Sequence, residues 1–240
     1  MSTLTDCPTF IDLKAAAAAL PAASGAQDDP FGEGCRMLPV KAGPCSIGIA
    51  VLAAGSGSAD SGTADRWLFV ESGQLALAHS SGELLLQSGE SCVVGRNTPF
   101  DWHCEAPARL IIMAYPGGES SGAGIVAIDN GAALAPSNPP AAHLLLGETP
   151  SCRSNNHFAS ADETFKCGIW DSTPYQRTPI FFHHTELMHL LDGEVSFTDA
   201  AGRSATFRKG DTFIIEQGAE CSWDSQVNVA KIYAQFRPAS

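Results

Sequence analysis

The sequence predicts an all-β protein built from two copies of one small β unit. Two observations carry this prediction. Short apolar segments bounded by Gly, Ser, Asp or Pro recur along the chain with almost no helical periodicity. In addition, residues 68–73 (LFVESG) recur as residues 188–193 (MHLLDG), 120 positions further on. Many short strands at about 8–12-residue spacing indicate an all-β barrel or sandwich, here present twice.

The repeat keeps its register over about 55 residues, which indicates a duplication rather than chance. Gly48 aligns with Gly168 at the same offset of 120. After one inserted residue the offset becomes 121, and Trp102 then aligns with Trp223. We therefore expect corresponding strands in the two halves of the chain.

The expected strands follow in order along each copy. In the first copy they are residues 46–52, 67–70, 74–78 and 110–114, and in the second they are 180–191, 195–198, 205–207, 213–216 and 229–236. Turns are expected at 80–83 and 199–202, where residues tolerate positive φ.

The length of 240 residues fits two domains. We expect an N-terminal arm (1–30), a first domain (31–116), a linker (117–150) rich in Pro, Gly and Ser, and a second domain (151–240). The Ala-rich residues 15–20 are not preceded by the basic region that a secretory signal peptide would have. We therefore expect them to form a short helix or a frayed arm. Residues 143–147 either form an extra, exchanged edge strand or pack across onto the other copy.

The net charge of -12, with only 14 Lys and Arg residues, argues against nucleic acid and against an anionic membrane surface as partners. No apolar run reaches the roughly 18–20 residues that a membrane span needs. The eight cysteines include no CxxC pair, and reduced thiols in a cytoplasmic protein are the simplest interpretation.

Several segments of the second copy carry a family resemblance. Residues 168–174 (GIWDSTP), 186–195 (ELMHLLDGEV) and 210–215 (GDTFII), followed by Trp223 and residues 231–233 (KIY), resemble a cupin. More narrowly, they are similar to the cupin subfamily that includes ureidoglycine aminohydrolase-type domains. The resemblance is specific over roughly residues 160–237 and weaker over 45–116.

This resemblance implies two tandem double-stranded β-helix (jelly-roll) domains, a bicupin, with a cavity at one mouth of each barrel. The second domain would carry any active or binding pocket. The first, a degenerate copy, would serve as a structural or dimerising partner. Because a jelly-roll sheet presents an apolar outer face that must be covered, we expect pairing of the two copies or a homodimer.

The resemblance also assigns metal-ligand positions. Metal-binding cupins usually take two His and a Glu from their first motif and a His from their second, and the aminohydrolases use a Glu/His/Gln variant. In the second copy the Glu falls on Glu186, the two preceding positions on Ile180 and Phe182, and the second-motif His on Cys221. The corresponding residues of the first copy are Asp60, Gly62, Arg66 and Phe100. A metal in the first copy is therefore not expected.

Period-two alternation places His184, Glu186 and Met188 on one face of a strand and His183, Leu187 and His189 on the other. If Cys221 faces the same barrel mouth, His184, Glu186 and Cys221 would suit a divalent ion such as Mn, Fe or Zn. We favour a pocket without a metal, because the spacing departs from that of the family.

Without a metal, Glu186 in an apolar barrel would have a raised pKa and serve as a general acid-base residue. The alternative is a structural ion pair with Lys231 or Arg177. The residues expected to line the pocket are Trp170, Phe182, His184, Met188, Cys221 and Trp223. Cys221 is more simply a buried small hydrophobe than a nucleophile, and the repeated Trp suits core packing as well as ligand stacking.

Two functions stay open at this point. The first is a small-molecule-binding cupin with a metal-poor pocket and no catalysis. The second is an enzyme resembling ureidoglycine aminohydrolase that acts on a small polar, nitrogen-containing metabolite with Glu186 as its acid-base or metal-ligand residue.

Overall fold

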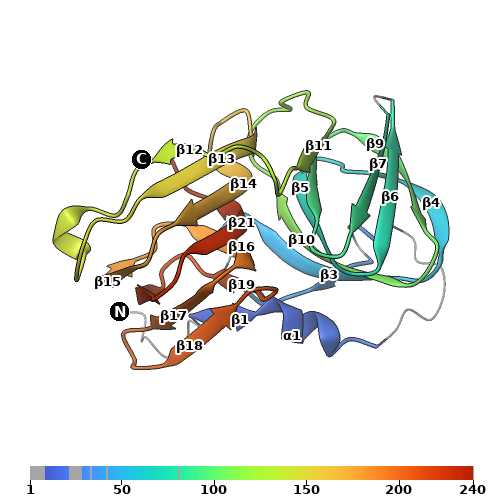
Figure 1. Ribbon diagram of the computed structural model, residues 1–240. Helices are drawn as coiled ribbons and strands as arrows, with labels where there is room; N and C mark the ends of the chain where they lie inside the picture. Colours follow the sequence, from blue (N-terminus) through green and yellow to red (C-terminus); the bar gives the residue numbers. More distant parts are fainter. Residues whose placement is uncertain (1–8, 22–28, 33, 42, 81, 240) are drawn as a thin grey trace.

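The computed structural model describes residues 9–21, 29–32, 34–41, 43–80 and 82–239, and nearly all of its regular structure is β-strand. Two barrels lie side by side, one from each half of the chain (Figure 1). The predicted all-β class is confirmed, and the two jelly-roll units agree with a tandem arrangement of cupin domains. In the described part of the chain, no helix is long and apolar enough to span a membrane.

The first barrel consists of two antiparallel sheets. The larger has the order β11 (Ile125–Ile128), β8 (Ser91–Val94), β5 (Asp65–Ser72), β10 (Ala108–Tyr115), β3 (Ser46–Leu52) and β2 (Arg36–Met37). The smaller has the order β4 (Gly55–Asp60), β9 (Pro99–Cys104), β6 (Gln74–His79) and β7 (Gly82–Gln87). Their inner faces enclose one apolar cluster that includes Leu68, Leu77 and Leu110.

The second barrel repeats this plan. Its larger sheet has the order β1 (Phe10–Asp12), β19 (Thr212–Ile215), β16 (Thr185–Asp192), β21 (Val229–Phe236), β14 (Phe165–Ser172), β13 (Cys152–Ala159) and β12 (Ala135–Ser137). Its smaller sheet has the order β15 (Tyr175–Phe181), β20 (Glu220–Ser225), β17 (Glu194–Thr198) and β18 (Ser204–Arg208). Strands β5 and β16 correspond at the offset of 120, and β8 and β19 at 121, as the repeat predicts.

A glycine ends the repeated segment in each copy, directly after β5 and β16. Gly73 and Gly193 have φ values of 85° and 82°, a region that L side chains rarely adopt. A Cβ on Gly193 would lie 2.0 Å from the carbonyl oxygen of Asn228. The turn therefore requires glycine both for its backbone conformation and for its close contact with the neighbouring loop.

The two larger sheets pack against each other and form the apolar interface between the barrels. This cluster combines Trp67 and Ile111 of the first barrel with Leu187 and Ile232 of the second. The ring of His189 lies 4.5 Å from that of Phe69 across the interface, measured between centroids. Strands such as β10 are buried on both faces, which explains the continuous apolar run from Leu110 to Tyr115. The expected pairing of the two copies is thus present within one chain.

The N-terminal segment joins the distant second barrel. Strand β1 pairs with β19, with Phe10 opposite Ile215, and helix α1 (Leu13–Ala18) follows directly. Asp12 caps the helix, because its carboxylate accepts a hydrogen bond from the backbone N–H of Ala15 at 2.8 Å. The helix is the one expected near residues 15–20, whereas residues 1–8 and 22–28 of the expected arm lie outside the described residues.

The expected linker is shared between the barrels. Strand β11 pairs with β8 of the first barrel and β12 with β13 of the second. Residues 143–147 contain the end of a short 3-10 helix, η2 (Ala142–Leu144), and Leu145 then forms an isolated bridge with Arg177. This segment therefore packs on the second barrel and not across onto the first.

The prediction of one continuous strand over residues 180–191 is wrong. Strand β15 ends at Phe181 and β16 begins at Thr185, with a turn between them. The N–H of Phe182 donates to the carbonyl of Ala219 at 2.7 Å, which holds the turn against the loop before β20. Because Phe182 is itself buried, the apolar pattern of the sequence continues through the turn, and the sequence alone does not indicate where β15 ends.

Candidate functional site

The candidate site begins on the inner face of β16, near the mouth of the second barrel. Glu186 and Met188 project to this side, where Met188 belongs to the barrel core, whereas Leu187 and His189 face the other barrel. The predicted alternation is therefore confirmed for these positions. It places one carboxylate, Glu186, at the inner wall of the barrel mouth.

A buried ion pair holds Glu186 in place. The Lys231 Nζ on β21 donates to Glu186 Oε1 at 2.8 Å, and both residues are less than a tenth exposed. On the other side, Nε2 of His184 lies 3.5 Å from Glu186 Oε2. Arg237 Nη2 lies 3.2 Å from His184 Nδ1, and because a guanidinium only donates, Nδ1 is the acceptor in this contact.

These charges reverse the expected titration of Glu186. Burial alone would raise its pKa, but the Lys231 ammonium and the hydrogen bond from His184 hold the pKa of Glu186 well below its ordinary value of 4.5. The prediction of a raised pKa is therefore wrong, and the alternative of an ion pair with Lys231 is the one observed. Glu186 is ionised near neutral pH and is suited to accept a hydrogen bond, not to donate one.

Aromatic rings surround the ammonium of Lys231. Its Nζ lies 4.8 Å from the ring centroid of Trp170 and 5.4 Å from that of Trp223. Tyr175 in turn stacks on Trp223 at 5.3 Å, and the indole Nε1 of Trp223 donates to Ser225 Oγ at 3.1 Å. Cation–π contacts of this kind stabilise a desolvated ammonium by about 0.5–2 kcal/mol each. The rings therefore fix the orientation of the Lys231 side chain.

The ion pair faces a polar pocket of about 410 Å³. Its lining comes from the mouth strands, from the segment after β21 and from the linker. The lining residues are Ser137, Asn138, Ser154, Asn156, Lys166, Trp170, His184, Glu186, Lys231, Tyr233, Gln235 and Arg237. Three of them carry positive charge and one carries negative charge. Tyr233 Oη donates to the side-chain carbonyl of Asn156, which fixes the amide at the pocket wall.

The structure divides the sequence-predicted residues into two groups. Trp170, His184 and Glu186 line the pocket. Phe182, Met188, Cys221 and Trp223 belong to the apolar core beneath it. Burial raises the pKa of the Cys221 thiol to about 12, so this cysteine is a buried hydrophobe and not an activated nucleophile. Its backbone carbonyl accepts a hydrogen bond from Arg177 Nη1 at 2.8 Å.

Sequence reasoning missed most of the polar lining. Lys231 was expected as a structural partner of Glu186, Tyr233 was named only within the family motif 231–233, and Asn156, Gln235 and Arg237 were not singled out. Gln235 and Tyr233 alternate with buried Ala234 and Phe236 along β21, so the period-two rule places them on the face of Lys231. No such alternation predicts that Ser137 and Asn138 line the pocket, because they come from the linker.

A metal ion does not fit the residues at this site. Within the described ranges, no three His, Cys, Asp or Glu side chains gather closely enough to hold one. His184 and Glu186 are together, but the candidate third ligand, Cys221, lies in the core, and the Lys231 ammonium occupies one side of the Glu186 carboxylate. The trio of His184, Glu186 and Cys221 considered from the sequence is therefore not assembled.

The first barrel carries different residues at the corresponding place. Arg66 takes the place of Glu186, and its Nη1 donates to the carbonyl of Phe31 at 2.6 Å. The Phe31 ring meets Trp102 edge to face at 6.0 Å and 72°, much as Trp170 meets Trp223 in the second barrel at 5.8 Å and 81°. A phenylalanine from an earlier segment thus lies beside Trp102 in the first barrel, where Trp170 lies beside Trp223 in the second.

Comparisons with known proteins agree with the fold. A family model described as the EutQ-like cupin domain matches residues 159–233. The structure of a DUF861-family protein of unknown function from Pseudomonas syringae pv. tomato str. DC3000 has a TM-score of 0.81 and 32% identity, covering 91% of this chain and 96% of that one. No match was found among curated proteins.

Two more distant structures show the fold alone. A cupin 2 conserved barrel domain protein from Leptotrichia buccalis has a TM-score of 0.66 and 11% identity, with 97% and 98% of the two chains covered. Protein Ylba from E. coli, also of the DUF861 family, has a TM-score of 0.59 and 11% identity, with 96% and 92% covered.

Proposed function

This chain belongs to the DUF861 family of cupin proteins, and on that premise we propose that its second barrel binds a small, negatively charged polar molecule without a metal. One observation carries the proposal. The pocket lining contains three of the chain's 14 Lys and Arg residues and only one of its 26 Asp and Glu residues. In a protein with a net charge of -12, this local excess of positive charge favours an anionic ligand.

The pocket offers a graded set of donors to such a ligand. Lys231 is buried and contacts Glu186 and the two indole rings, whereas Arg237 is exposed at the rim of the pocket. Lys166 also lines the pocket, although its Nζ is 2.7 Å from Glu163 Oε2. A carboxylate matches the planar fork of Arg237, and the amides of Asn156 and Gln235 add neutral hydrogen-bonding groups. The volume of about 410 Å³ suits a small metabolite.

The alternative is an enzyme resembling ureidoglycine aminohydrolase. The ionised Glu186 carboxylate, with the His184 imidazole beside it, is the observation that favours it, because the carboxylate can accept a hydrogen bond from a bound nitrogen-containing substrate. In this role the ionised Glu186 orients the substrate. Turnover of such a substrate that disappears in Glu186→Gln would support this alternative.

Calorimetric titration of the chelator-treated protein tests the binding proposal. The probes are small mono- and dicarboxylates, with the matching amides and primary amines as neutral and cationic counterparts. We expect carboxylates to bind and their affinity to fall at least about tenfold in Arg237→Gln, which loses a charge-assisted contact. Arg208→Gln is the matched control, because Arg208 pairs with Glu194 on the outside of the barrel.

Two results would contradict the proposal. One is stronger binding of the amides or amines than of the carboxylates. The other is an equal loss of affinity in Arg237→Gln and Arg208→Gln. Binding that appears only after addition of Mn²⁺, Fe²⁺ or Zn²⁺ would overturn its metal-free part.

A further inference from the structure

The smaller sheet of the first barrel ends at β7, an outer strand with an exposed leucine, Leu85, near its centre. Among the described residues, β7 pairs only with β6. Its sequence, GELLLQ, has three successive leucines and no Lys, Arg or Pro, and Leu85 is 55% exposed. Soluble proteins usually protect such an edge with charges, prolines or bulges, because its unpaired N–H and C=O groups recruit another strand.

The second barrel supplies an internal comparison. Its β18 ends the corresponding sheet, but it is flanked by Arg203 and Lys209 and ends in Arg208. On the outer face of that sheet, the hydroxyls of Ser196 and Thr206 are 2.8 Å apart and hydrogen bonded. Both barrels share one fold, so the fold itself does not demand an apolar edge.

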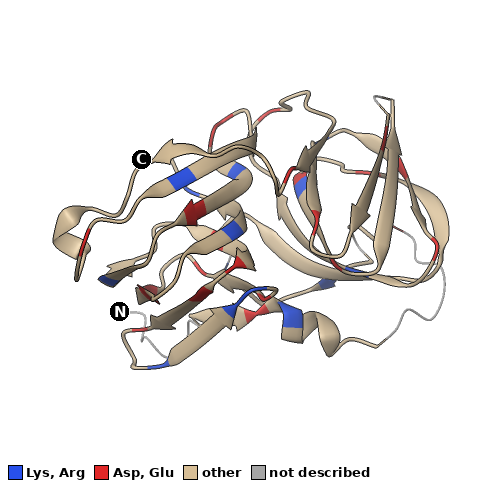
Figure 2. Cartoon of the chain, viewed as in Figure 1, with Lys and Arg blue, Asp and Glu red and all other residues tan. Residues whose placement is uncertain are grey.

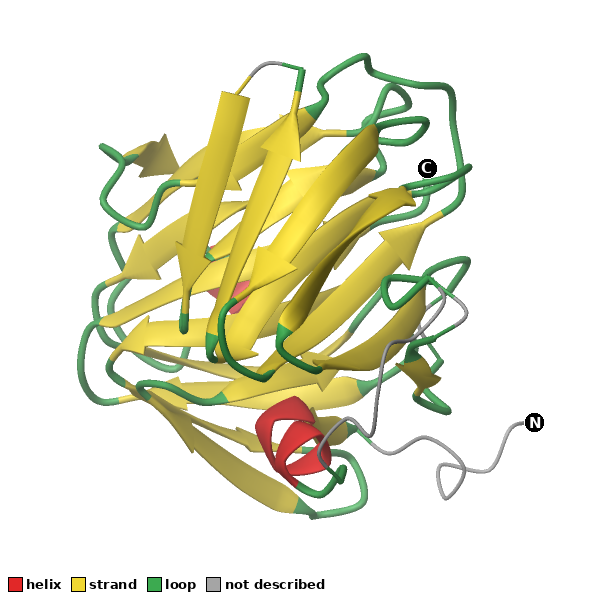
Figure 3. Ribbon diagram, turned by 90° about the vertical axis from the view of Figure 1, so that its right-hand side faces the viewer, coloured by secondary structure: helices red, strands yellow, loops and turns green. Residues whose placement is uncertain are grey.

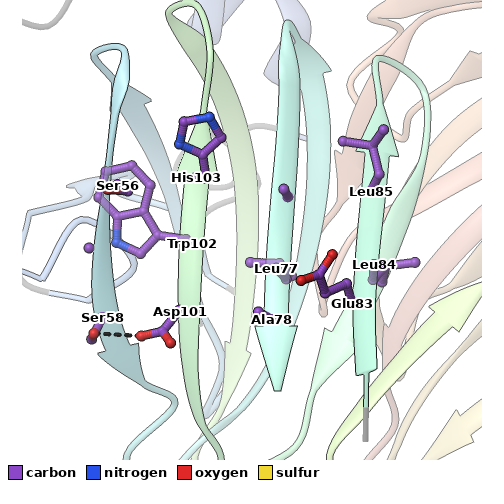
Figure 4. A pocket seen from close by; sticks show the side chains of 12 residues that line it. Ser56, Ser58, Leu77, Ala78, Glu83, Leu84, Leu85, Asp101, Trp102 and His103 are labelled. Carbon is purple, nitrogen blue, oxygen red and sulfur yellow. Dashed lines mark hydrogen bonds between the residues drawn. The ribbon is translucent and has the colours of Figure 1, made fainter. Parts of the chain in front are cut away.

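The residues at the same places in the first barrel are apolar. Ala76 and Leu85 form the cross-strand pair that corresponds to Ser196 and Thr206. Beside them a groove of about 700 Å³ runs over the outer face, with Glu83 and Leu85 on one side and Asp101 and His103 on the other (Figure 4). The four strands of this sheet contain no Lys or Arg (Figure 2). The strands of this sheet are seen face-on in Figure 3.

We propose that two copies of this chain associate through β7, paired antiparallel about a two-fold axis that passes by Leu85. The two small sheets then form one continuous sheet, and each copy covers the edge of the other. The contact is self-complementary, as a two-fold interface requires. This inference does not depend on the proposed ligand pocket, which lies in the other barrel.

Side-chain chemistry selects the register. With Leu85 opposite the partner's Leu85, Leu84 lies opposite the partner's Leu86, and Glu83 opposite the partner's Gln87. Leu84 and Leu86 both face the barrel interior, and Leu85 faces outward. In this register the two residues of each cross-strand pair therefore lie on the same face of the joined sheet. Registers moved toward the hairpin turn place Glu83 against the partner's Leu85 or the partner's Glu83, and like charges directly opposite are unfavourable.

Sedimentation equilibrium of the full chain, together with oxidative cross-linking, tests the interface. The wild type is expected to be a dimer. Leu85→Lys should raise the dimer dissociation constant at least about tenfold, because it places two like charges at the axis. The matched control, Thr206→Lys at the edge of the second barrel, should leave it unchanged. Circular dichroism and the melting temperature confirm that both variants fold, as expected for exposed positions.

Cross-linking checks the register directly. Residues opposite each other in an antiparallel pair have Cα atoms about 4.5–5.5 Å apart, within the range that a disulfide spans. Under mild oxidation Leu85→Cys should give a covalent dimer, whereas Thr206→Cys and the wild type should not. A monomeric wild type, a dimer that survives Leu85→Lys, or a Leu85→Cys protein that does not cross-link would each overturn the proposal.

Discussion

Replacing Lys231 with methionine probes the ion pair at the centre of the pocket. The Lys231 Nζ lies 2.8 Å from Glu186 Oε1, and neither side chain is appreciably exposed. Removing one partner of a buried pair costs about 3–5 kcal/mol, because the other charge stays buried without its counter-ion. We expect the lower end, about 3 kcal/mol, since His184 still faces the carboxylate. In a chain of this length that lowers the melting temperature by about 6–12 °C.

The pH dependence separates a lost charge pair from lost packing. In the wild type the pKa of Glu186 lies below 4.5, so its ionised form adds stability that is present above pH 4.5 and lost as the pH falls through the folded-state pKa. In Lys231→Met, burial raises the pKa of Glu186 above 4.5, so stability is lost as the pH rises above that value. The difference between the proteins is therefore largest near pH 7 and smaller at pH 4.5.

Urea unfolding followed by tryptophan fluorescence at both pH values measures the two free energies of unfolding. The double variant Glu186→Gln, Lys231→Met is the matched control, because it removes the orphaned charge and should recover part of the stability. A loss that is the same at both pH values, or a double variant no more stable than Lys231→Met, would refute the assignment of the effect to the buried charge.

Two further predictions concern the scaffold. Burial lowers the pKa of His189 to about 4, with Lys14 acting in the same direction and Asp211 against it. Since only the unfolded state is protonated between pH 6.5 and 4, stability should fall by up to about 3 kcal/mol over that range. His189→Leu should abolish this slope in urea unfolding, and an unchanged slope would contradict the reasoning. Gly193→Ala should cost about 2–3 kcal/mol, because its Cβ meets the carbonyl of Asn228. Gly202→Ala has φ of 77° but open space and should cost about 1 kcal/mol, so equal losses in the same assay would argue against the steric explanation.

The barrel interior followed from the sequence because its signals are local. The repeat at offsets of 120 and 121 located corresponding strands, and period-two alternation assigned Glu186 and Met188 to the barrel side of β16. Both depend on residues close together in the chain, where strand geometry fixes which face a side chain takes. The sequence did not predict the turn at Phe182, because a buried residue in a turn continues the apolar pattern of the strands beside it.

The fold class, the duplication and the inward position of Glu186 were thus determined by the sequence itself, whereas the chemistry of Glu186 was decided by the tertiary structure. Lys231 lies 45 residues away and reaches Glu186 only because β21 pairs with β16. Alternation tells which face a carboxylate occupies but not which charge lies across from it, and that neighbour decides whether burial raises or lowers its pKa. For the same reason only the fold brings the linker residues Ser137 and Asn138 to the pocket wall, since contacts between distant strands leave no periodic trace in the chain.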